Sequence, residues 1–343
     1  MPDFDDHEVV HFVSDRSSGL RAIIAVHSTH LGPGAGGARF WHYADPEHAV
    51  TDALRLSRGM SFKNAMAGLP LGGGKAVILA DAARTKSPDM LAAFGRAIEG
   101  LNGRYVTAED VGMTVADMVA ISRETRHVSG LPVQSGAIGG DPGPHTALGV
   151  FLGIKAAVLR VLGKDSVAGL HVAIQGVGSV GGGLARLAAA DGARLTLGDV
   201  DTARANALAR ELGAQVASAD DILAVDADVV SPCALGAILT ETGIAALRAP
   251  IVAGGANNQL AHARCGALLH DRGILYAPDY VINAGGIINV ASEYLGDRDA
   301  SIVERRIAGI PDRLESIWAT SAADGRDPAS VADDMARKLI GRS

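Results

Sequence analysis

The stretch GLHVAIQGVGSVGGGLARLAAADGARLTLGD, from Gly169 to Asp199, contains the pattern that decides the fold class. It predicts an apolar strand, the glycine-rich turn GVGSVG at 176–181, a helix through Ala190 and a second strand. That second strand ends at Asp199, 23 residues after the first glycine of the turn. A strand, a glycine turn, a helix and a strand in this order are typical of a doubly wound α/β domain.

The turn GVGSVG is also typical of a site for a dinucleotide cofactor. Gly176 permits the tight turn, Gly178 lets the backbone approach a pyrophosphate, and Gly181 lets the helix pack closely on the strand. The helix N-terminus, with Ser179 and Val180 in its first turn, favours the phosphate charge. A GxGxxG pattern alone is weak, and a turn that binds no nucleotide is the alternative. The strand before the turn and the helix after it favour the cofactor site.

Asp199 bears on which dinucleotide is bound. Its carboxylate would accept hydrogen bonds from the ribose hydroxyls and repel a 2′-phosphate. The next residues, Val200 and Asp201, include no arginine that could hold such a phosphate. The sequence therefore favours NAD over NADP.

Two later apolar pairs, Val229–Val230 and Ile251–Val252, fit further strands of the same sheet. Small or polar residues follow each of them, at 231–234 and at 253–258. Ligands of open α/β sheets bind outside the carboxyl ends of the strands, so both segments belong at the cofactor. The candidate cofactor contacts in these segments are Cys233, Ala234 and Asn257.

A second stretch, LRLSRGMSFKNAMAGLPLGGGKAVIL from Leu54 to Leu79, has the features of a catalytic centre. It contains Lys63 and Lys75, and three glycines directly precede Lys75. Glycines carry no side chain, so backbone and ligand can approach closely there. The apolar residues 76–79 predict a buried strand. Burial lowers the pKa of an ammonium group, which would suit Lys75 for acid–base chemistry.

Lys63 extends the inward stripe of a predicted helix. Asp45 is the expected N-cap of this helix, with Pro46 in its first position. The residues that recur every three or four positions before Lys63 are Val50, Leu54, Ser57 and Met60. A solvated lysine is expected on the opposite face, so this position favours a ligand-binding role. A lysine that snorkels at a helix end is the alternative.

Two further features could complete a site. Gly36 and Gly37, in LGPGAGGARF, form either an ordinary turn or a loop whose backbone N–H groups hold a carboxylate. Asp110, in TAEDVG at 107–112, follows a predicted short strand at 104–106. It either caps the next helix or is a catalytic group at a strand end. The spacing decides neither question.

The segment GGGK is similar to part of a P-loop, whose pattern is GxxxxGK[ST]. Leu69 stands where the first glycine is required, and Ala76 stands where Ser or Thr must hold magnesium. The pattern fails at both positions, which excludes a nucleoside triphosphatase.

Composition and charge narrow the class further. The chain has 343 residues, 48% of them apolar and 20% charged, which is typical of a globular protein with two domains. A net charge of −7 argues against a nucleic-acid partner. Cys233 and Cys265 lack metal-ligand spacing, so we expect no metal site and a reducing, cytoplasmic location. The acidic N-terminus is unlike a signal peptide, and no apolar run approaches membrane-spanning length, so we expect no membrane partner.

These motifs together resemble the amino-acid dehydrogenase family that includes leucine, phenylalanine, valine and glutamate dehydrogenases, in its leucine and phenylalanine branch. The resemblance runs through most of the chain. Its motifs, in order, are LGPGAGGAR, RGMSFKNAMAGLPLGGGKAVI, TAEDVG, GDPGPHTALGV, GVGSVG, SPCALGAIL, VAGGANNQL and PDYVINAGGIINV. Modest departures, Gly143 for a serine and Ser292 for an acid, leave the catalytic positions untouched.

The resemblance implies a fold as well. It implies an N-terminal α/β substrate-binding domain at 1–135 and a Rossmann-type NAD domain, with a doubly wound sheet, at 136–300. Helices at 301–343 would pack back towards the first domain, and the active site would lie in the cleft between the domains. Homo-oligomers are expected from the same resemblance.

The resemblance also implies roles for single residues. Lys75 would be the catalytic lysine and Asp110 its acidic partner. Lys63 would pair with the substrate carboxylate, close to Met60 and assisted by the backbone of Gly36 and Gly37. Asn258, together with Asn257, would lie near the substrate and the nicotinamide.

The side-chain pocket that the resemblance implies is uncharged. Its residues would be Ala35, Ala108, Ile287 and Val290. A glutamate side chain would find no partner there, and burying a carboxylate unpaired is costly, so glutamate is an unlikely substrate. Ala35 enlarges the pocket, whereas Ile287 and Val290 narrow it. Leucine and valine are favoured over phenylalanine, but the residues leave both open.

The expected reaction is NAD-dependent oxidative deamination of an apolar L-amino acid to the 2-oxo acid, ammonium and NADH. The alternative is a non-catalytic protein that binds NAD or senses amino acids on the same fold. The presence of Lys63, Lys75 and Asp110 argues against it, because a sensor needs no base to activate water.

Overall fold

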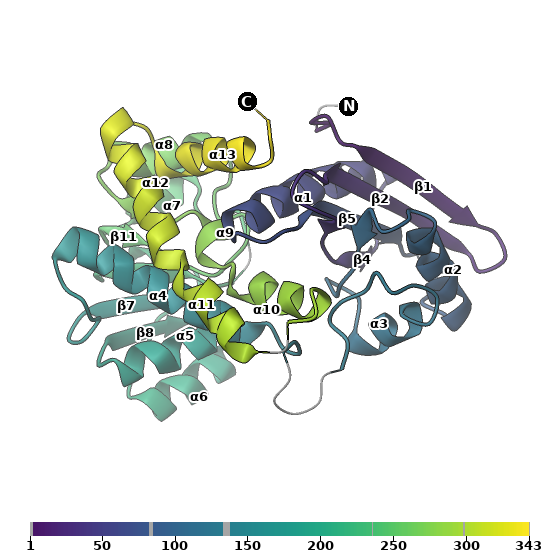
Figure 1. The fold of residues 1–343 in the computed structure, drawn as a ribbon. Helices are drawn as coiled ribbons and strands as arrows, with labels where there is room; N and C mark the ends of the chain where they lie inside the picture. Colours follow the sequence, from purple (N-terminus) through teal and green to yellow (C-terminus); the bar gives the residue numbers. More distant parts are fainter. Residues whose placement is uncertain (1–2, 82–84, 133–137, 235, 298, 343) are drawn as a thin grey trace. The chain divides into compact units, whose positions relative to one another are not determined.

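The computed structural model describes residues 3–81, 85–132, 138–234, 236–297 and 299–342 (Figure 1). The chain forms two compact units. The first consists of Met1–Gly140, Asn289–Val303 and Ala336–Ser343, and the second of Asp141–Ile288 and Glu304–Met335. The predicted boundary at 135–136 lies outside the described residues. The predicted segment 301–343 is not a unit of its own, because most of it belongs to the second unit and its last eight residues belong to the first.

The first unit is built on a mixed six-stranded sheet. Its strand order is β1-β2-β5-β3-β6, and β4 also pairs with β5. The pairs β1–β2 and β2–β5 are antiparallel, whereas β3 and β4 are parallel to β5 and β6 is parallel to β3. The strands are β1 (Val9–Asp15), β2 (Leu20–Ser28), β3 (Gly34–Ala35), β4 (Ala38–Trp41), β5 (Gly72–Leu79) and β6 (Tyr105–Val106).

Helices cover both faces of this sheet, so its central strands are buried on both sides. Helix α1 (Pro46–Met66) packs on one face, and α2 (Pro88–Glu99) and α3 (Val115–Ile121) pack on the other. Side chains alternate along a strand, and β2 shows this period of two. Its residues Ile23 and Ala25 face α1, and Ala22, Ile24 and Val26 face α2 and α3.

The start of α1 follows the sequence prediction. The side chain of Asp45 accepts a hydrogen bond from the His48 backbone N–H, and Pro46 opens the helix. The stripe is less regular than predicted. Leu54 and Ser57 are buried, whereas Met60 and Lys63 are only partly buried near the helix end.

The segment LGPGAGGARF contains two strands, where we expected only a glycine-dense loop. The reason is close packing. A Cβ on Gly34 would lie 2.7 Å from Val26 Cγ1, and one on Gly36 would lie 2.0 Å from the Gly74 oxygen. Glycine is therefore required for β3 to lie against its neighbours, although glycine by itself disfavours strands.

The second unit contains a fully parallel six-stranded sheet with the order β12-β11-β10-β7-β8-β9. Counted along the chain from β7, the order is 3-2-1-4-5-6 from one edge, the order of a Rossmann fold. The predicted doubly wound sheet is thereby confirmed. The strands are β7 (His171–Gln175), β8 (Arg194–Gly198), β9 (Gln215–Val216), β10 (Val229–Pro232), β11 (Ile251–Val252) and β12 (Leu275–Tyr276).

Helices of the second unit pack on this sheet (Figure 1). They are α4 (Gly143–Leu162), α5 (Ser179–Ala190), α6 (Thr202–Leu212), the 3-10 helix η1 (Ile222–Ala224), α7 (Glu241–Ala246), α8 (Arg264–Asp271), α9 (Asp279–Ile282) and α12 (Ile310–Asp324). Three helices extend across a unit boundary along the chain: α10 (Gly285–Tyr294), α11 (Ala300–Ala308) and α13 (Pro328–Leu339).

Helix α4 corrects one expectation from the sequence. It is the one helix among the described ranges that is long and apolar enough to cross a membrane, whereas we expected no such run. It lies inside the second unit as a core helix against α5 and α12. A Cβ on Gly153 would lie 2.5 Å from Ile282 Cγ1, so its glycine face is fitted to protein neighbours.

Candidate active site

Lys75 and Asp110 form a direct ion pair in the first unit. Lys75 lies on β5 and is only 6% exposed. Its Nζ is 2.7 Å from Asp110 Oδ2. The glycines ahead of Lys75 are explained by packing, because a Cβ on Gly73 would lie 2.1 Å from the Ser61 nitrogen and one on Gly74 would meet Tyr105. The sheet therefore fixes the backbone that carries the lysine.

Arg39, which the sequence reading overlooked, also binds Asp110. It lies on β4, and its Nε donates to the same oxygen, Asp110 Oδ2, at 3.1 Å. Its Nη1 donates to Asp52 Oδ2 on α1 at 2.9 Å. The Tyr43 hydroxyl donates to that Asp52 oxygen at 2.6 Å. Lys75, Arg39, Asp52, Tyr43 and Asp110 thus form one connected group, which we call the lysine cluster.

Burial and charge shift the pKa values in the lysine cluster. Burial lowers the pKa of Lys75, although Asp110 opposes this, and Arg39 lowers it further. Burial alone would raise the pKa of Asp110, but the Lys75 and Arg39 cations outweigh it and lower that pKa. The cluster therefore keeps Asp110 ionised and eases loss of the Lys75 proton, which is what a buried general base requires.

The predicted carboxylate-binding residues lie at the end of α1 and beside β3. Lys63 is partly buried in the last turn of α1. Met60 packs against Gly36, because a Cβ there would lie 2.9 Å from Met60 Cγ. The Gly36 backbone N–H already donates to Val106 O at 3.1 Å, so it is not available for a ligand. Of the two glycines, only Gly37 remains a candidate for binding the substrate carboxylate.

Asn64, one residue after Lys63, was not predicted either. It is fully buried, and its amide donates to the Gly72 oxygen at 2.6 Å. It therefore ties the last turn of α1 to the start of β5. No local sequence pattern distinguishes this asparagine, because the contact between the end of α1 and the start of β5 forms only in the tertiary fold.

The predicted pocket residues are distributed over several elements. Ala35 is buried on β3, and Ala108 is partly buried just after β6. Ile287 and Val290 are partly buried on α10. By contact clustering, Ile287 falls in the second unit and the other three fall in the first.

The glycine turn in the second unit has the geometry that its sequence predicts. Gly176 has φ +84°, in the left-handed region that favours glycine. A Cβ on Gly181 would lie 1.8 Å from the Gly176 oxygen, so helix α5 needs glycine to reach β7. A Cβ on Gly178 would meet nothing within 4 Å, which leaves room for a ligand at the N-terminus of α5. Ser179 and Val180 open that helix. These residues fit a dinucleotide phosphate.

Asp199 supports the turn through its side chain. It follows β8 and is 8% exposed. Its Oδ2 accepts from the Val177 backbone N–H at 2.7 Å, and its Oδ1 accepts from that of Asp201 at 2.8 Å. Arg204, on α6, lies 3.8 Å from Asp199 and 3.1 Å from Asp201. Arg204 lies five residues beyond Asp199, so the residues directly after Asp199 do not reveal it in the sequence.

Cys233 and Ala234 follow β10 and lie beside the glycine turn. A Cβ on Gly176 would lie 2.8 Å from Ala234, and one on Gly181 would lie 3.0 Å from Cys233. Burial raises the pKa of the Cys233 thiol, which argues against a nucleophilic role for it. β7 and β10 are neighbours at the point where the strand order reverses, where dinucleotides bind.

Asn257 and Asn258 follow β11 at the same edge of the sheet. The Asn283 amide donates to Asn257 Oδ1 at 2.8 Å. Asn258 has φ +52°, and its backbone oxygen accepts from the Ala237 N–H. Its side chain lines a pocket of about 200 Å³ together with Asp279 and Tyr280. Both asparagines are exposed and could contact a ligand.

Comparison with known proteins agrees with this geometry. A family model described as "Glu/Leu/Phe/Val dehydrogenase, dimerisation domain" matches residues 7–127, and one described as "Glutamate/Leucine/Phenylalanine/Valine dehydrogenase" matches 195–323. A leucine dehydrogenase of Geobacillus stearothermophilus is 48% identical over 336 residues, which are 98% of this chain and 91% of that protein.

The chain belongs to the Glu/Leu/Phe/Val dehydrogenase family. A valine dehydrogenase of Streptomyces virginiae is 46% identical over 97% of this chain and 94% of its own. The crystal structure of L-tryptophan dehydrogenase from Nostoc punctiforme superposes with a TM-score of 0.87 at 42% identity, covering 98% of this chain and 96% of that one. The resemblance drawn from the motifs is confirmed. As a member of the Glu/Leu/Phe/Val dehydrogenase family, the chain is an amino-acid dehydrogenase with a Rossmann unit for a nicotinamide cofactor.

Proposed function

We propose that this dehydrogenase oxidatively deaminates an L-amino acid with an aliphatic side chain, with NAD as cofactor. The single observation that carries the proposal is the buried Lys75–Asp110 pair, in which Nζ and Oδ2 are 2.7 Å apart. A lysine whose pKa is lowered by burial, beside an ionised carboxylate, is suited to remove a proton from water.

Each residue then has a defined task. A bound nicotinamide would supply the acceptor for the hydride that leaves the α-carbon of the substrate, and this carbon would become an iminium carbon. Lys75, in its neutral form, takes a proton from the water that attacks this carbon. Asp110 takes a proton from the substrate amino group before oxidation and returns one to the departing nitrogen. The C–N bond then breaks with its electron pair going to nitrogen, and the hydroxyl proton passes to that nitrogen, which gives ammonium and the 2-oxo acid. The proton held by Lys75 is released to solvent.

Lys63 and Gly37 are proposed to bind the substrate carboxylate. Lys63 supplies the positive charge from the end of α1, and the Gly37 amide supplies a hydrogen-bond donor. A Cβ on Gly37 would lie 2.3 Å from the Glu109 oxygen, so this position accepts only glycine. Asn258 is proposed to lie near the substrate and the nicotinamide.

NAD is favoured over NADP by the charges at the end of β8. Asp199 and Asp201 carry two negative charges, against the single positive charge of Arg204 that lies between them. The remaining negative charge repels a 2′-phosphate, and Asp199 keeps lone pairs for a ribose hydroxyl. We expect kcat/KM for NAD to exceed that for NADP at least about tenfold, which corresponds to about 1.4 kcal/mol.

An aliphatic substrate is favoured by the pocket residues and by the relatives. Ala35, Ala108, Ile287 and Val290 offer no charge to a glutamate side chain. Two of the similar proteins are a leucine dehydrogenase and a valine dehydrogenase. A similar protein at 42% identity is a tryptophan dehydrogenase. Aromatic amino acids are therefore tested together with aliphatic ones.

The test is NADH formation at alkaline pH with leucine, valine, isoleucine, phenylalanine, tryptophan and glutamate. We expect the highest kcat/KM with one of the first three and none with glutamate. Lys75→Ala should abolish turnover and keep NAD binding, measured by quenching of protein fluorescence. Wild-type protein that binds NAD but turns over no amino acid would refute the proposal and favour a sensor.

Assembly into a homo-oligomer through the first unit is also proposed. β1 is an edge strand of its sheet, and Phe12 on it is 60% exposed. An exposed edge strand with a large apolar side chain is suited to association. Light scattering of the wild type and of Phe12→Lys tests this: the variant should have the lower mass, and two equal masses would count against β1. Both cysteines are free thiols, which suits the proposed cytoplasmic location.

A further inference from the structure

Two cations share one oxygen in the lysine cluster. Lys75 Nζ and Arg39 Nε both contact Asp110 Oδ2, at 2.7 Å and 3.1 Å. Only one of these cations can lose its proton at working pH, because a guanidinium stays charged under all such conditions. When Lys75 becomes neutral, the Asp110 carboxylate therefore still has a cationic partner.

We propose that Arg39 is a positioning residue that acts as the permanent counter-ion of Asp110 and so permits Lys75 to work as a neutral base. The inference rests on the proposed function of Lys75 and Asp110. Without Arg39, loss of the Lys75 proton would leave a carboxylate with 22% exposed side chain without its ion pair. Leaving a partly buried charge uncompensated is costly, so the proton would stay on Lys75.

Asp52 and Tyr43 fix the arginine and balance its charge. Asp52 Oδ2 binds Arg39 Nη1 at 2.9 Å, and the Tyr43 hydroxyl donates to the same oxygen at 2.6 Å. Arg39 lies in an extended strand, β4, and its guanidinium bridges two carboxylates from different elements. With Lys75 protonated, the two cations and two carboxylates of the cluster sum to zero charge. With Lys75 neutral, the sum is −1.

The titratable groups around the cluster come from α1, β2, β4 and β6. Besides Arg39 on β4 and Asp52 on α1, they are Lys63 near the end of α1, His27 on β2, which binds Ser61, and Tyr105 on β6, whose hydroxyl donates to the Gly36 oxygen. Burial lowers the pKa of His27 to about 3 and raises that of Tyr105, so both stay neutral at working pH. Together with Asp110, Arg39 and Asp52 are the charged groups that shift the pKa of Lys75.

Arg39 and Asp52 shift the pKa of Lys75 in opposite directions, which gives a test by sign. Arg39 lowers it and Asp52 raises it. In the pH profile of kcat/KM, activity rises as Lys75 loses its proton. For Arg39→Met this rise should move to higher pH by about 1 unit or more, and for Asp52→Asn it should move to lower pH. Arg39→Lys keeps the charge and should fall between Arg39→Met and the wild type.

Arg55→Met is the matched control. Arg55 lies on α1 three residues after Asp52, and it is an exposed arginine whose ion pair is with Asp3. Its pH profile should coincide with that of the wild type. A uniform loss of kcat at every pH in both Arg39→Met and Asp52→Asn, with the rise unmoved, would overturn the proposal. That result would leave Arg39 a purely structural role.

A second measurement separates this proposal from the proposed function. The Cε resonance of Lys75, in protein labelled with ¹³C-lysine and assigned by its absence in Lys75→Ala, titrates with the side chain itself. Its midpoint should rise in Arg39→Met and fall in Asp52→Asn. If no amino acid is turned over, the proposed function fails, and the titration still decides the role of Arg39. Unchanged midpoints in both variants would overturn it.

Discussion

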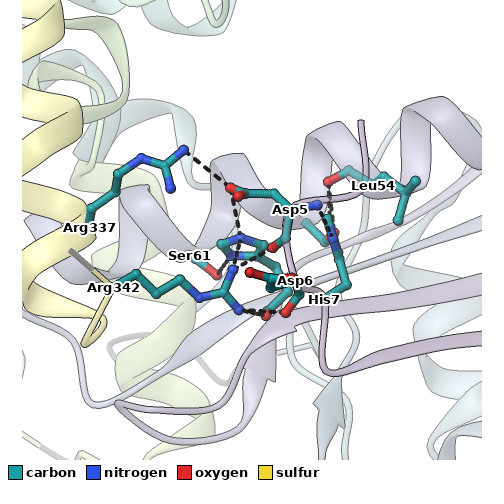
Figure 2. Close-up of polar contacts among 9 residues, drawn as sticks. Asp5, Asp6, His7, Leu54, Ser61, Arg337 and Arg342 are labelled. Atoms are coloured by element: carbon teal, nitrogen blue, oxygen red, sulfur yellow. Dashed lines mark hydrogen bonds and ion pairs between the residues drawn. The ribbon is translucent and has the colours of Figure 1, made fainter. Parts of the chain in front are cut away.

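The first unit contains two clusters of partly buried charged residues that have opposite designs. In the lysine cluster, charged side chains face one another, and two cations meet at one carboxylate oxygen. The second, which we call the terminal cluster, joins both ends of the chain to α1 and β2 (Figure 2). Its members are Asp5, Asp6, His7, His27, Ser61, Arg337 and Arg342.

In the terminal cluster, the charged donors bind mainly fixed backbone acceptors. Arg342 donates to the backbone oxygens of Asp5, Asp6 and His27, at 2.5, 2.9 and 2.6 Å. Arg337 donates to the Asp5 carboxylate at 3.3 Å and lies over the Phe62 ring. Carbonyl oxygens do not titrate, so these bonds keep their strength over a wide range of pH.

His27 shows the same design in its protonation state. Its Nε2 is 3.4 Å from Asp5 Oδ2, which by distance alone would be an ion pair. Burial and the charge of Arg342 nevertheless lower the pKa of His27 to about 3, so the ring is neutral. Its Nε2 then accepts from Arg342 at 2.8 Å, and Nδ1–H donates to Ser61 Oγ at 2.8 Å. A partly buried charge is structural where its partners are backbone oxygens, and it is reactive where a partner side chain can gain or lose a proton.

The largest expected difference between the clusters is in catalysis. Lys75→Ala should lower kcat at least about 10³-fold, because it removes the general base. The free energy of unfolding should change little, since Asp110 keeps its bond to Arg39. Steady-state kinetics and urea denaturation of the same preparation measure both quantities. A residual kcat above one tenth of wild type would assign the base to another residue.

Arg342→Met should have the reverse effect. The substitution removes the Arg342 donor from three backbone oxygens and one ring nitrogen. We expect the free energy of unfolding of the first unit to fall by about 3 kcal/mol. The kcat of the folded protein should stay within about twofold of the wild type. Hydrogen exchange of the β2 amides reports stability locally. Arg55→Met, an exposed arginine, should stay within about 0.5 kcal/mol, and equal losses in the two variants would contradict a special role for Arg342.

The lowered pKa of His27 predicts that the stability of the folded chain depends on pH. Its pKa is about 3 in the folded chain and near the ordinary value of 6.5 in the unfolded one. As pH falls below 6.5 the unfolded chain takes up the proton first, so stability decreases from pH 6.5 towards pH 3. Between pH 7 and pH 4, the free energy of unfolding should fall by about 3 kcal/mol less in His27→Gln than in the wild type. Parallel losses in the two proteins would show that His27 does not control this window.

The two clusters also show what a sequence can predict. The glycine turn, its flanking strand and helix, and the N-cap of α1 depend on residues close together in the chain, and all of them appear as predicted. Lys75 and Asp110 could be found because motifs mark each of them. Arg39 ends the motif LGPGAGGAR, but its bond to Asp110, 71 residues away, depends on tertiary structure and could not be predicted. The pairing of His27 with Arg342, 315 residues apart, depends entirely on tertiary structure.

Strands β3 and β4 were not predicted, for a related reason. Glycine favours turns by its own conformational freedom, and the segment holding Gly34, Gly36 and Gly37 therefore looks like a loop. Its strand character comes from neighbours that approach to distances only glycine allows. The same approach uses the Gly36 amide in a bond to Val106, which the sequence alone would leave free for a substrate.

Tyr43→Phe is expected to have the smallest effect of these variants, and it separates the loss of a hydrogen bond from the loss of a charge. Tyr43→Phe removes one hydrogen bond to the Asp52 carboxylate, and we expect a loss of about 1 kcal/mol in the free energy of unfolding. It removes no charge, so the rise of the pH profile should stay where it is in the wild type, unlike in Asp52→Asn. Denaturation and the pH profile of kcat/KM measure the two effects. If Tyr43→Phe moved the rise as far as Asp52→Asn, hydrogen-bond geometry and not charge would govern Lys75. If only Asp52→Asn moves it, the lysine cluster acts through its charges, whereas the terminal cluster acts through its bonds.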